Sequence, residues 1–398
     1  MTLDLAALSV QIERFRHALS ERDVLEEERV RRALALLDGG DDPEAIRAKV
    51  ERARTPWRAA VPLEPLTSRG SASPLPAEFS ALASDGSTNE PDRHGSVMCY
   101  LINIGLVALH YGHRPDALLH SEPFLGYKDE DLYISAGQWR IPISSAMLAI
   151  RRQIMETERL AALASSLPEG RAAVALQDGT LTIGGLEGPG LEKWVHDNFL
   201  PPLLGYYERF REQGVPLASY ISRPRHQEVV NTLRILACPE ARPNCMNGCP
   251  SPADTKSGGA HLCHLISDLT DRFLFRAILE PGERSGVFQS LSPISREYFG
   301  DHRVHFFYVH VGSELARVEV PEWVTRGQTM LGLVHGAVID QCERGRGYPT
   351  ALMEAHEQAV LRVGDRRQLE LMLDAALVRA GLPVSTSEKE RGKRLRAL

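Results

Sequence analysis

Apolar side chains recur at helical spacing in the first 55 residues. Leu5, Leu8, Ile12, Phe15 and Leu19 follow one another at intervals of three or four residues, so an α-helix would carry them on one face. A second stretch with this period covers residues 24–37, and Asp42 followed by a proline is typical of the start of another helix. We predict a helical N-terminal region over residues 1–55, arranged as a helical hairpin.

The composition changes after this region. Five prolines and several serines between residues 56 and 76 predict a Pro-rich linker over residues 56–80. At the other end of the chain, residues 385–398 form a basic tail with five Lys or Arg against two Glu. The main domain is therefore expected over residues 81–384.

Short apolar stretches and amphipathic helices alternate within this domain. Residues 79–84, 97–111 and 171–176 are apolar in the manner of buried strands, whereas residues 144–165 have the spacing of a long helix. Strands separated by a helix predict a mixed α/β domain. The same criteria predict strands at 131–139, 304–311 and 315–320, and helices at 191–212, 227–236, 350–363 and 366–380.

Two of the apolar stretches run into the same kind of motif, an aspartate, a glycine and a hydroxyl residue. The motifs are Asp85-Gly86-Ser87 and Asp178-Gly179-Thr180. A carboxylate at the end of a strand is exposed yet rigidly held, which suits Mg²⁺ or Mn²⁺ because these hard cations take oxygen ligands. An Asp-Gly pair is also typical of a hairpin turn. Both interpretations stay open for each motif.

The predicted helix over residues 144–165 offers further carboxylates. Glu156 lies at the margin of the apolar stripe, from which it could reach a site at the sheet, while Glu158 lies further onto the charged face. The alternative is an ordinary solvated glutamate paired with Arg152, four residues earlier.

A histidine and a tyrosine stand near the end of the domain. Gly345 and Gly347 interrupt the chain, Tyr348 follows, and Pro349 marks the start of a helix. His356 shares its predicted face with apolar residues and is expected to point inward, as a core histidine would. A histidine and a tyrosine beside a carboxylate-bound metal could instead position water, ligate the metal or donate to a phosphate oxygen.

Composition limits the classes of partner. Apolar residues make up 43% of the chain and charged residues 25%, which is usual for a globular protein and excludes wholesale disorder. The formal net charge of −6 excludes a basic surface overall, so any contact with nucleic acid must be local. Arg317 is expected to be structural, paired with Glu314 or Glu319. Candidates for phosphate contacts, or for ordinary surface ion pairs, are Arg223, Arg225, Arg284, Arg344 and Arg346.

Four of the six cysteines cluster in an insert over residues 238–264. Cys238, Cys245, Cys249 and Cys263 are separated by six, three and thirteen residues, which is neither a disulfide framework nor a standard CxxC pair. They could bind Zn²⁺ or an iron–sulfur cluster, or they could be reduced thiols in a loop.

A reducing cytoplasm is the expected location of the protein. No secretory signal or membrane span is predicted.

Several motifs in one order give the chain a resemblance to a known family. Besides DGS and DGT, these are YISRPR (220–225), LTDRFLF (269–275), PGERS (281–285), FFYVHVGSELARVEVPEW (306–323) and GYPTALMEAHEQAV (347–360). Together they resemble the NurA nucleases over residues 81–393. The resemblance implies an RNase H-like mixed sheet flanked by helices and a homodimer. It also implies a manganese-dependent 5′–3′ exonuclease and single-strand endonuclease that works with the hexameric HerA translocase in DNA end resection and double-strand break repair.

The same resemblance implies the site residues. Asp85, Glu156 and Asp178 would be the catalytic carboxylates, with Tyr348 and His356 beside them. The carboxylates and His356 would hold two Mn²⁺ or Mg²⁺ ions. The cysteine insert departs from the family's catalytic pattern. The chain contains no Walker A motif, so an ATP-driven motor must be a partner. Two alternatives remain, a non-catalytic DNA-binding subunit of the ATPase and a metal-dependent phosphodiesterase for smaller substrates.

Overall fold

The computed structural model describes residues 4–37, 42–91, 97–136, 139–183, 191–246, 249 and 262–384. The predicted basic tail therefore lies outside the described residues, as does part of the insert. The chain divides into two compact units, each built from two stretches of sequence. The first unit comprises residues 1–72 and 221–319, and the second comprises residues 73–220 and 320–398.

The first unit combines N-terminal helices with a small sheet. Its strands follow the order β1-β11-β12-β13, and β10 pairs with both β12 and β2. A shared apolar core joins residues of the N-terminal helices to those of β11 and β12. The helices are α1 (Leu5–Leu37), α2 (Pro43–Arg52), α6 (Glu228–Leu236), α7 (Leu262–Leu265), α8 (Asp271–Arg276), α9 (Pro293–Tyr298) and a 3₁₀ turn (Gly300–His302). The strands are β1 (Ala60–Pro62), β2 (Arg69–Ser71), β10 (Glu283–Ser285), β11 (Phe288–Ser290), β12 (Val304–His310) and β13 (Leu315–Pro321).

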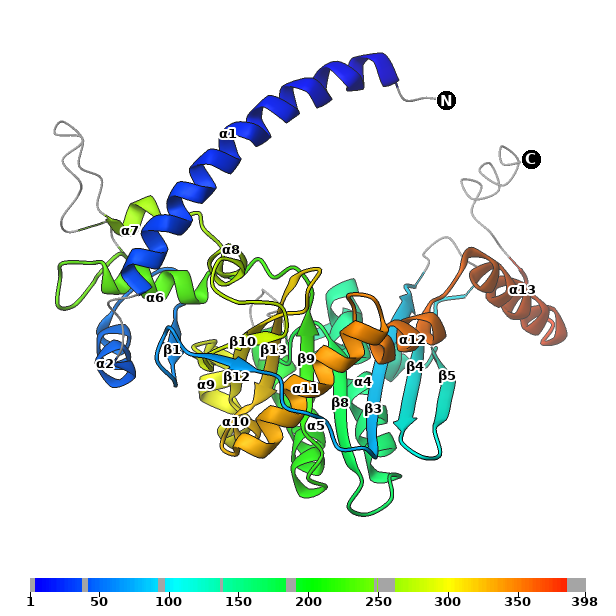
Figure 1. Ribbon diagram of the computed structural model, residues 1–398. Coiled ribbons are helices and arrows are strands. Elements are labelled where there is room, and N and C mark those ends of the chain that lie inside the picture. Colours follow the sequence, from blue (N-terminus) through cyan, green and yellow to red (C-terminus); the bar gives the residue numbers. More distant parts are fainter. Residues whose placement is uncertain are drawn as a thin grey trace. The chain divides into compact units, whose positions relative to one another are not determined.

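Two predictions for this region are wrong. Residues 5–37 form one continuous helix of 33 residues instead of a hairpin (Figure 1), because Glu21-Arg22-Asp23 is charged but contains no helix-breaking residue. The segment 56–80 is more than a linker, since β1 pairs with β11 and β2 pairs with β10. The predicted cap is correct, because the Asp42 carboxylate accepts the amide hydrogens of Glu44 and Ala45 at the start of α2.

The second unit contains the sheet that carries the predicted site. Its strand order is β9-β8-β3-β4-β5. The neighbours β3, β4 and β5 pair antiparallel, whereas β8 pairs parallel with β3 and β9 pairs parallel with β8. This order, with α4 before β8 and α5 before β9, is that of an RNase H-like fold and confirms the predicted mixed sheet. The elements are β3 (Phe79–Asn89), β4 (Tyr100–Tyr111), β5 (Asp116–Gly126), α4 (Ser145–Ser165), β8 (Ala172–Asp178), α5 (Leu191–Glu212) and β9 (Leu217–Ile221).

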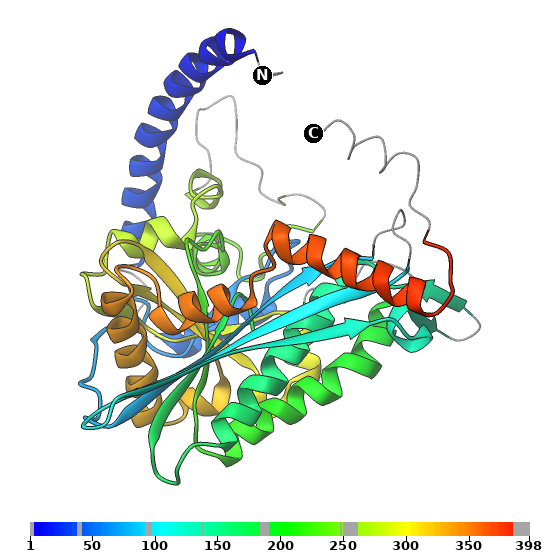
Figure 2. The same ribbon diagram turned by 90° about the vertical axis from the view of Figure 1, so that its right-hand side faces the viewer.

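Helices cover both faces of this sheet. The helix α12 (Thr350–Ala359) lies on one face against β3 and β4, while α4 and α5 lie on the other (Figures 1 and 2). The unit is completed by α3 (Asp129–Leu132), β6 (Tyr133–Ala136), β7 (Trp139–Pro142), α10 (Glu322–Thr325), α11 (Gln328–Arg344) and α13 (Val363–Arg379). The strand expected over 131–139 is thus a helical turn followed by β6. Of the helices in the described part of the chain, none has the length and apolar character needed to span a bilayer.

Candidate active site

The aspartate of the first motif lies in the middle of a strand. The strand β3 continues through Asp85 to Asn89, and Asp85 pairs with Gly105 of β4. The expectation that Asp85 ends a strand or begins a turn is therefore wrong, because β4 gives the whole motif a hydrogen-bonding partner. The second motif behaves as expected, since β8 ends at Asp178 and Gly179 follows with a φ of +85°.

His356 is the nearest partner of Asp85. Its Nδ1 lies 2.7 Å from Asp85 Oδ2, while Asp85 Oδ1 accepts a hydrogen bond from the Gly86 amide. The expectation that His356 points into the core is wrong, because its side chain is 63% exposed. Leu352, Ala355 and Ala359 form the buried face of α12, and His356 lies at the edge of that face. There it is open to solvent and still reaches the carboxylate.

The contact between His356 and Asp85 depends on the close approach of α12 to the sheet. A Cβ atom on Gly105 would lie 2.1 Å from the carbonyl oxygen of Ala355, the residue before His356, so only glycine leaves room for the helix. Two side chains then fix the end of the helix, because Asn103 Nδ2 and Ser87 Oγ both donate to the carbonyl oxygen of Ala359. These contacts hold His356 over Asp85.

Glu156 approaches the motif from α4. It is only 6% exposed, and its Oε1 has no hydrogen-bond partner, although Arg152 Nε lies 3.3 Å away. The missing side chain of Gly86 leaves space for the carboxylate, since a Cβ there would lie 2.6 Å from Glu156 Oε1. Glu158 instead forms an ion pair with Arg159. The structure thus places Glu156, and not Glu158, beside the DGS motif.

The three carboxylates influence one another. Burial raises the pKa of Glu156 to about 8; Arg152 opposes this shift, and the charges of Asp85 and Asp178 add to it. The pKa of Asp178 is raised as well, first by burial of its carboxyl group and then by the charge of Asp85. A hydrogen bond from Tyr348 opposes this rise. Three acidic groups within electrostatic range of one another are costly to ionise together.

Tyr348 completes the cluster. Its hydroxyl donates to Asp178, and burial together with that carboxylate raises the pKa of Tyr348, which keeps the phenol protonated. The ring packs edge-to-face on Tyr220, with 5.4 Å between centroids. Gly345 allows the tight turn before Tyr348, because a Cβ there would lie 1.9 Å from the Tyr348 carbonyl oxygen. The structure therefore brings together all five residues that the sequence singled out.

The donor set suits a hard divalent cation. In the described residues, no group of three or more His, Cys, Asp or Glu side chains is already arranged to hold a metal ion. The chemistry of the cluster nevertheless fits one, since Glu156 Oε1 is buried without a hydrogen bond, and burial, with repulsion from the other carboxylates added, raises the pKa values of Glu156 and Asp178. A cation among these oxygens would relieve both costs.

We expect the metal-free protein to lose stability as the pH rises toward about 8. The raised pKa means that folded Glu156 keeps its proton between the ordinary value of 4.5 and about 8, where the unfolded chain has lost it, so the unfolding free energy falls over this range. Thermal melting in chelator between about pH 5 and about pH 9 measures the effect. Glu156→Gln should flatten the slope, and the matched control Glu158→Gln should not. A slope shared by wild type and Glu156→Gln would contradict this assignment.

The candidate DNA-contacting arginines divide into two groups. Arg223, Arg284 and Arg344 form ion pairs with Glu314, Glu64 and Asp340 respectively. Arg225 and Arg346 are exposed. Contact with DNA stays a prediction for all five. Arg317 is structural as expected, fully buried between Glu319 and Glu228.

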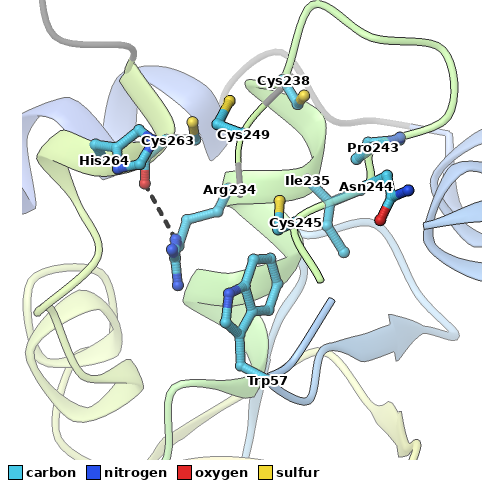
Figure 3. A pocket seen from close by; sticks show the side chains of 10 residues that line it. All are labelled: Trp57, Arg234, Ile235, Cys238, Pro243, Asn244, Cys245, Cys249, Cys263 and His264. Atoms are coloured by element: carbon cyan, nitrogen blue, oxygen red, sulfur yellow. Dashed lines mark hydrogen bonds between the residues drawn. The ribbon is translucent and has the colours of Figure 1, made fainter. Parts of the chain in front are cut away.

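Sequence reasoning missed two contributors to the site. It treated Arg152 only as a surface partner, yet this side chain also donates to the Gly86 carbonyl oxygen from Nη1 at 2.6 Å. It passed over Gly105, although a lone glycine inside an apolar strand is a known signal of close backbone approach. The four insert cysteines belong to the first unit, where they line one cavity (Figure 3).

The strand order and the carboxylates beside it define an RNase H-like domain of the nuclease class. The chain belongs to the NurA family, because the model of the NurA domain matches residues 79–361. This membership confirms the resemblance found in the sequence and supports a nuclease. A search of curated protein sequences found no significant match.

Solved structures with a similar backbone trace include nucleases. Endonuclease V from Ciona intestinalis is 12% identical, covers 74% of this chain and 87% of its own, and has a TM-score of 0.33. The catalytic domain of human endonuclease V is 14% identical; the match covers 88% of this chain and 98% of that domain, with a TM-score of 0.31. Thermus thermophilus RuvC is 16% identical; the match covers 49% of this chain and 96% of RuvC, with a TM-score of 0.15. Because these TM-scores are low, the fold assignment rests on the strand order of the chain itself.

Proposed function

We propose that this protein is a divalent-metal-dependent deoxyribonuclease. The observation that carries the proposal is the convergence of Asp85 from β3, Asp178 from β8 and Glu156 from the helix α4, with His356 hydrogen-bonded to Asp85. Clustered carboxylates of this kind hold the ions that assist phosphodiester hydrolysis. Membership of the NurA family supports the same activity.

The residues that would hold the metal are Asp85, Glu156, Asp178 and His356. Two Mn²⁺ or Mg²⁺ ions would, when bound, neutralise charge on the phosphate and lower the pKa of an attacking water. Burial of Glu156 excludes water from one side of this cluster, which strengthens its electrostatic interactions. The carboxylates must lose their protons first, so binding is expected to favour alkaline pH.

His356 and Tyr348 have complementary tasks in this proposal. When His356 donates its Nδ1 hydrogen to Asp85, Nε2 of the neutral ring is the acceptor, which can take a proton from water or bind the ion. Exposure of the ring gives it access to a DNA backbone. Tyr348 stays protonated, and its single hydroxyl hydrogen holds Asp178 in place. Once a metal ion takes over that carboxylate, the same hydrogen can be donated to a phosphate oxygen instead.

The finer assignment follows from the family. We propose 5′–3′ exonuclease and single-strand endonuclease activity in DNA end resection and double-strand break repair, by a cytoplasmic homodimer. A HerA-type hexameric ATPase would be the partner that supplies translocation, since this chain carries no Walker A motif.

We expect the purified chain to degrade linear DNA in the presence of Mn²⁺ or Mg²⁺. Cleavage should stop completely when a chelator removes the metal. DNA labelled at the 5′ or the 3′ end gives the polarity, and circular single-stranded DNA tests the endonuclease activity. A small chromogenic phosphodiester is the control substrate. The proposal fails if cleavage persists in chelator or if only the small diester is hydrolysed, as a phosphodiesterase for smaller substrates would do.

The non-catalytic alternative has a different signature. A regulatory subunit would bind DNA and stimulate the ATPase without cutting, and the Asp85→Asn variant would stimulate it as well as wild type. Assays with and without a HerA-type ATPase, on both forms of the chain, separate this possibility from a nuclease that the ATPase activates.

A further inference from the structure

Four cysteines of the first unit surround one cavity. Cys238, Cys245, Cys249 and Cys263 line a space of about 240 Å³, and Figure 3 shows their side chains gathered around it with Arg234. None of the six cysteines of the chain forms a disulfide. The proposed nuclease chemistry uses no residue of this cavity, so its thiols call for an explanation of their own.

Hydrogen bonds fix the backbone at three of these cysteines. Each bond ties a cysteine to a different part of the unit, namely the chain after α2, the helix α2 itself and the helix α6. The bonds run from the Cys245 amide to the Arg54 carbonyl oxygen (2.8 Å), from Lys49 Nζ to the Cys238 carbonyl oxygen (2.8 Å) and from Arg234 Nε to the Cys263 carbonyl oxygen (3.1 Å). The thiols are therefore presented from anchored backbone, as metal ligands usually are.

The surroundings of the thiols suit an anionic centre. Arg234 lines the same cavity as the four cysteines, so its guanidinium lies beside their thiols. The guanidinium stacks over the Trp57 ring, 4.3 Å from its centroid, which holds the positive charge in place. A fixed cation beside four thiols would offset the negative charge of thiolates bound to a metal.

We propose that Cys238, Cys245, Cys249 and Cys263 hold an iron–sulfur cluster. A single Zn²⁺ requires four ligands converging at about 2.3 Å from one point. The thiols instead surround a larger space, which suits a cluster whose separate iron atoms each take their own cysteine. The cluster would join α7, which carries Cys263, to the chain that follows α6.

The test begins with the wild-type full-length chain, purified without oxygen. We expect iron and acid-labile sulfide in comparable amounts, with a broad visible absorbance that fades on reduction. If the protein is isolated without iron, reconstitution with ferrous iron and sulfide should restore both signals. Failure to take up iron and sulfide, or stoichiometric zinc in their place, would overturn the proposal.

Variants then assign the ligands. Cys245→Ser and Cys263→Ser should each lose most of the iron, whereas Cys99→Ser, which removes a buried thiol outside the cavity, should keep it. Full iron content in both cavity variants would refute the assignment. Asp85→Asn should retain the iron, so the cluster and the nuclease proposal can fail separately. If a cavity variant does not fold, the metal analysis of the wild type still decides.

Discussion

Replacement of Asp85 by asparagine should remove nearly all metal-dependent DNA cleavage. The substitution keeps the shape of the side chain but removes the charge that the other two carboxylates sense and that His356 contacts. Loss of several kcal/mol of metal-assisted transition-state stabilisation corresponds to a rate loss on the order of 100- to 1,000-fold. Initial rates on linear DNA with saturating Mn²⁺ measure the effect.

A matched control shows whether the loss is specific. Asp116 lies at the exposed start of β5, where its carboxylate accepts the amide hydrogen of Ala117. Asp116→Asn makes the same chemical change and should leave the rate unchanged. Melting curves of both variants in chelator should show folded protein. Wild-type cleavage by folded Asp85→Asn would remove Asp85 from the site.

Addition of a single methyl group at Gly105 should nearly inactivate the enzyme. In Gly105→Ala, the Cβ would overlap the Ala355 carbonyl oxygen, so α12 must move away from the sheet and carry His356 with it. A displacement of about 1 Å at a catalytic group can cost about 100-fold in rate. Overpacking should also lower the unfolding free energy by about 1–3 kcal/mol.

The control for this variant is another glycine of the same unit. Gly205 lies in α5, and a Cβ there would meet nothing within 4 Å. Gly205→Ala should therefore keep full activity and gain about 0.5–1 kcal/mol of stability, as a glycine-to-alanine change in a helix does. Rates and melting temperatures of the two variants test the difference. If folded Gly105→Ala cleaves DNA as fast as wild type, the position of α12 does not affect the reaction.

Local sequence patterns predicted much of the fold. The spacing of apolar residues located α4 and α5 almost to the residue, and β8 ends at the predicted Asp178. The errors arose where the outcome depended on distant partners. The strand β3 runs through Asp85-Gly86-Ser87 because β4 pairs with the whole motif, and no local feature of an Asp-Gly pair reveals such a neighbour.

The candidate site shows the same limit. Motifs and family resemblance selected its five residues, but they could not give the exposure of His356. An (i, i+4) pattern groups His356 with Leu352, yet a residue at the edge of an apolar stripe turns inward or outward according to what packs there. Arg152 and Gly105 escaped notice because their importance comes from contacts with residues far away in the sequence.

The contact between Asp85 and His356 spans 271 positions of the chain. During synthesis on the ribosome, the strand with the aspartate emerges long before the helix with the histidine. A growing polypeptide would thus carry an incomplete set of the proposed catalytic groups until His356 has been added. In the proposed nuclease, this order of assembly delays activity until the whole domain has been made.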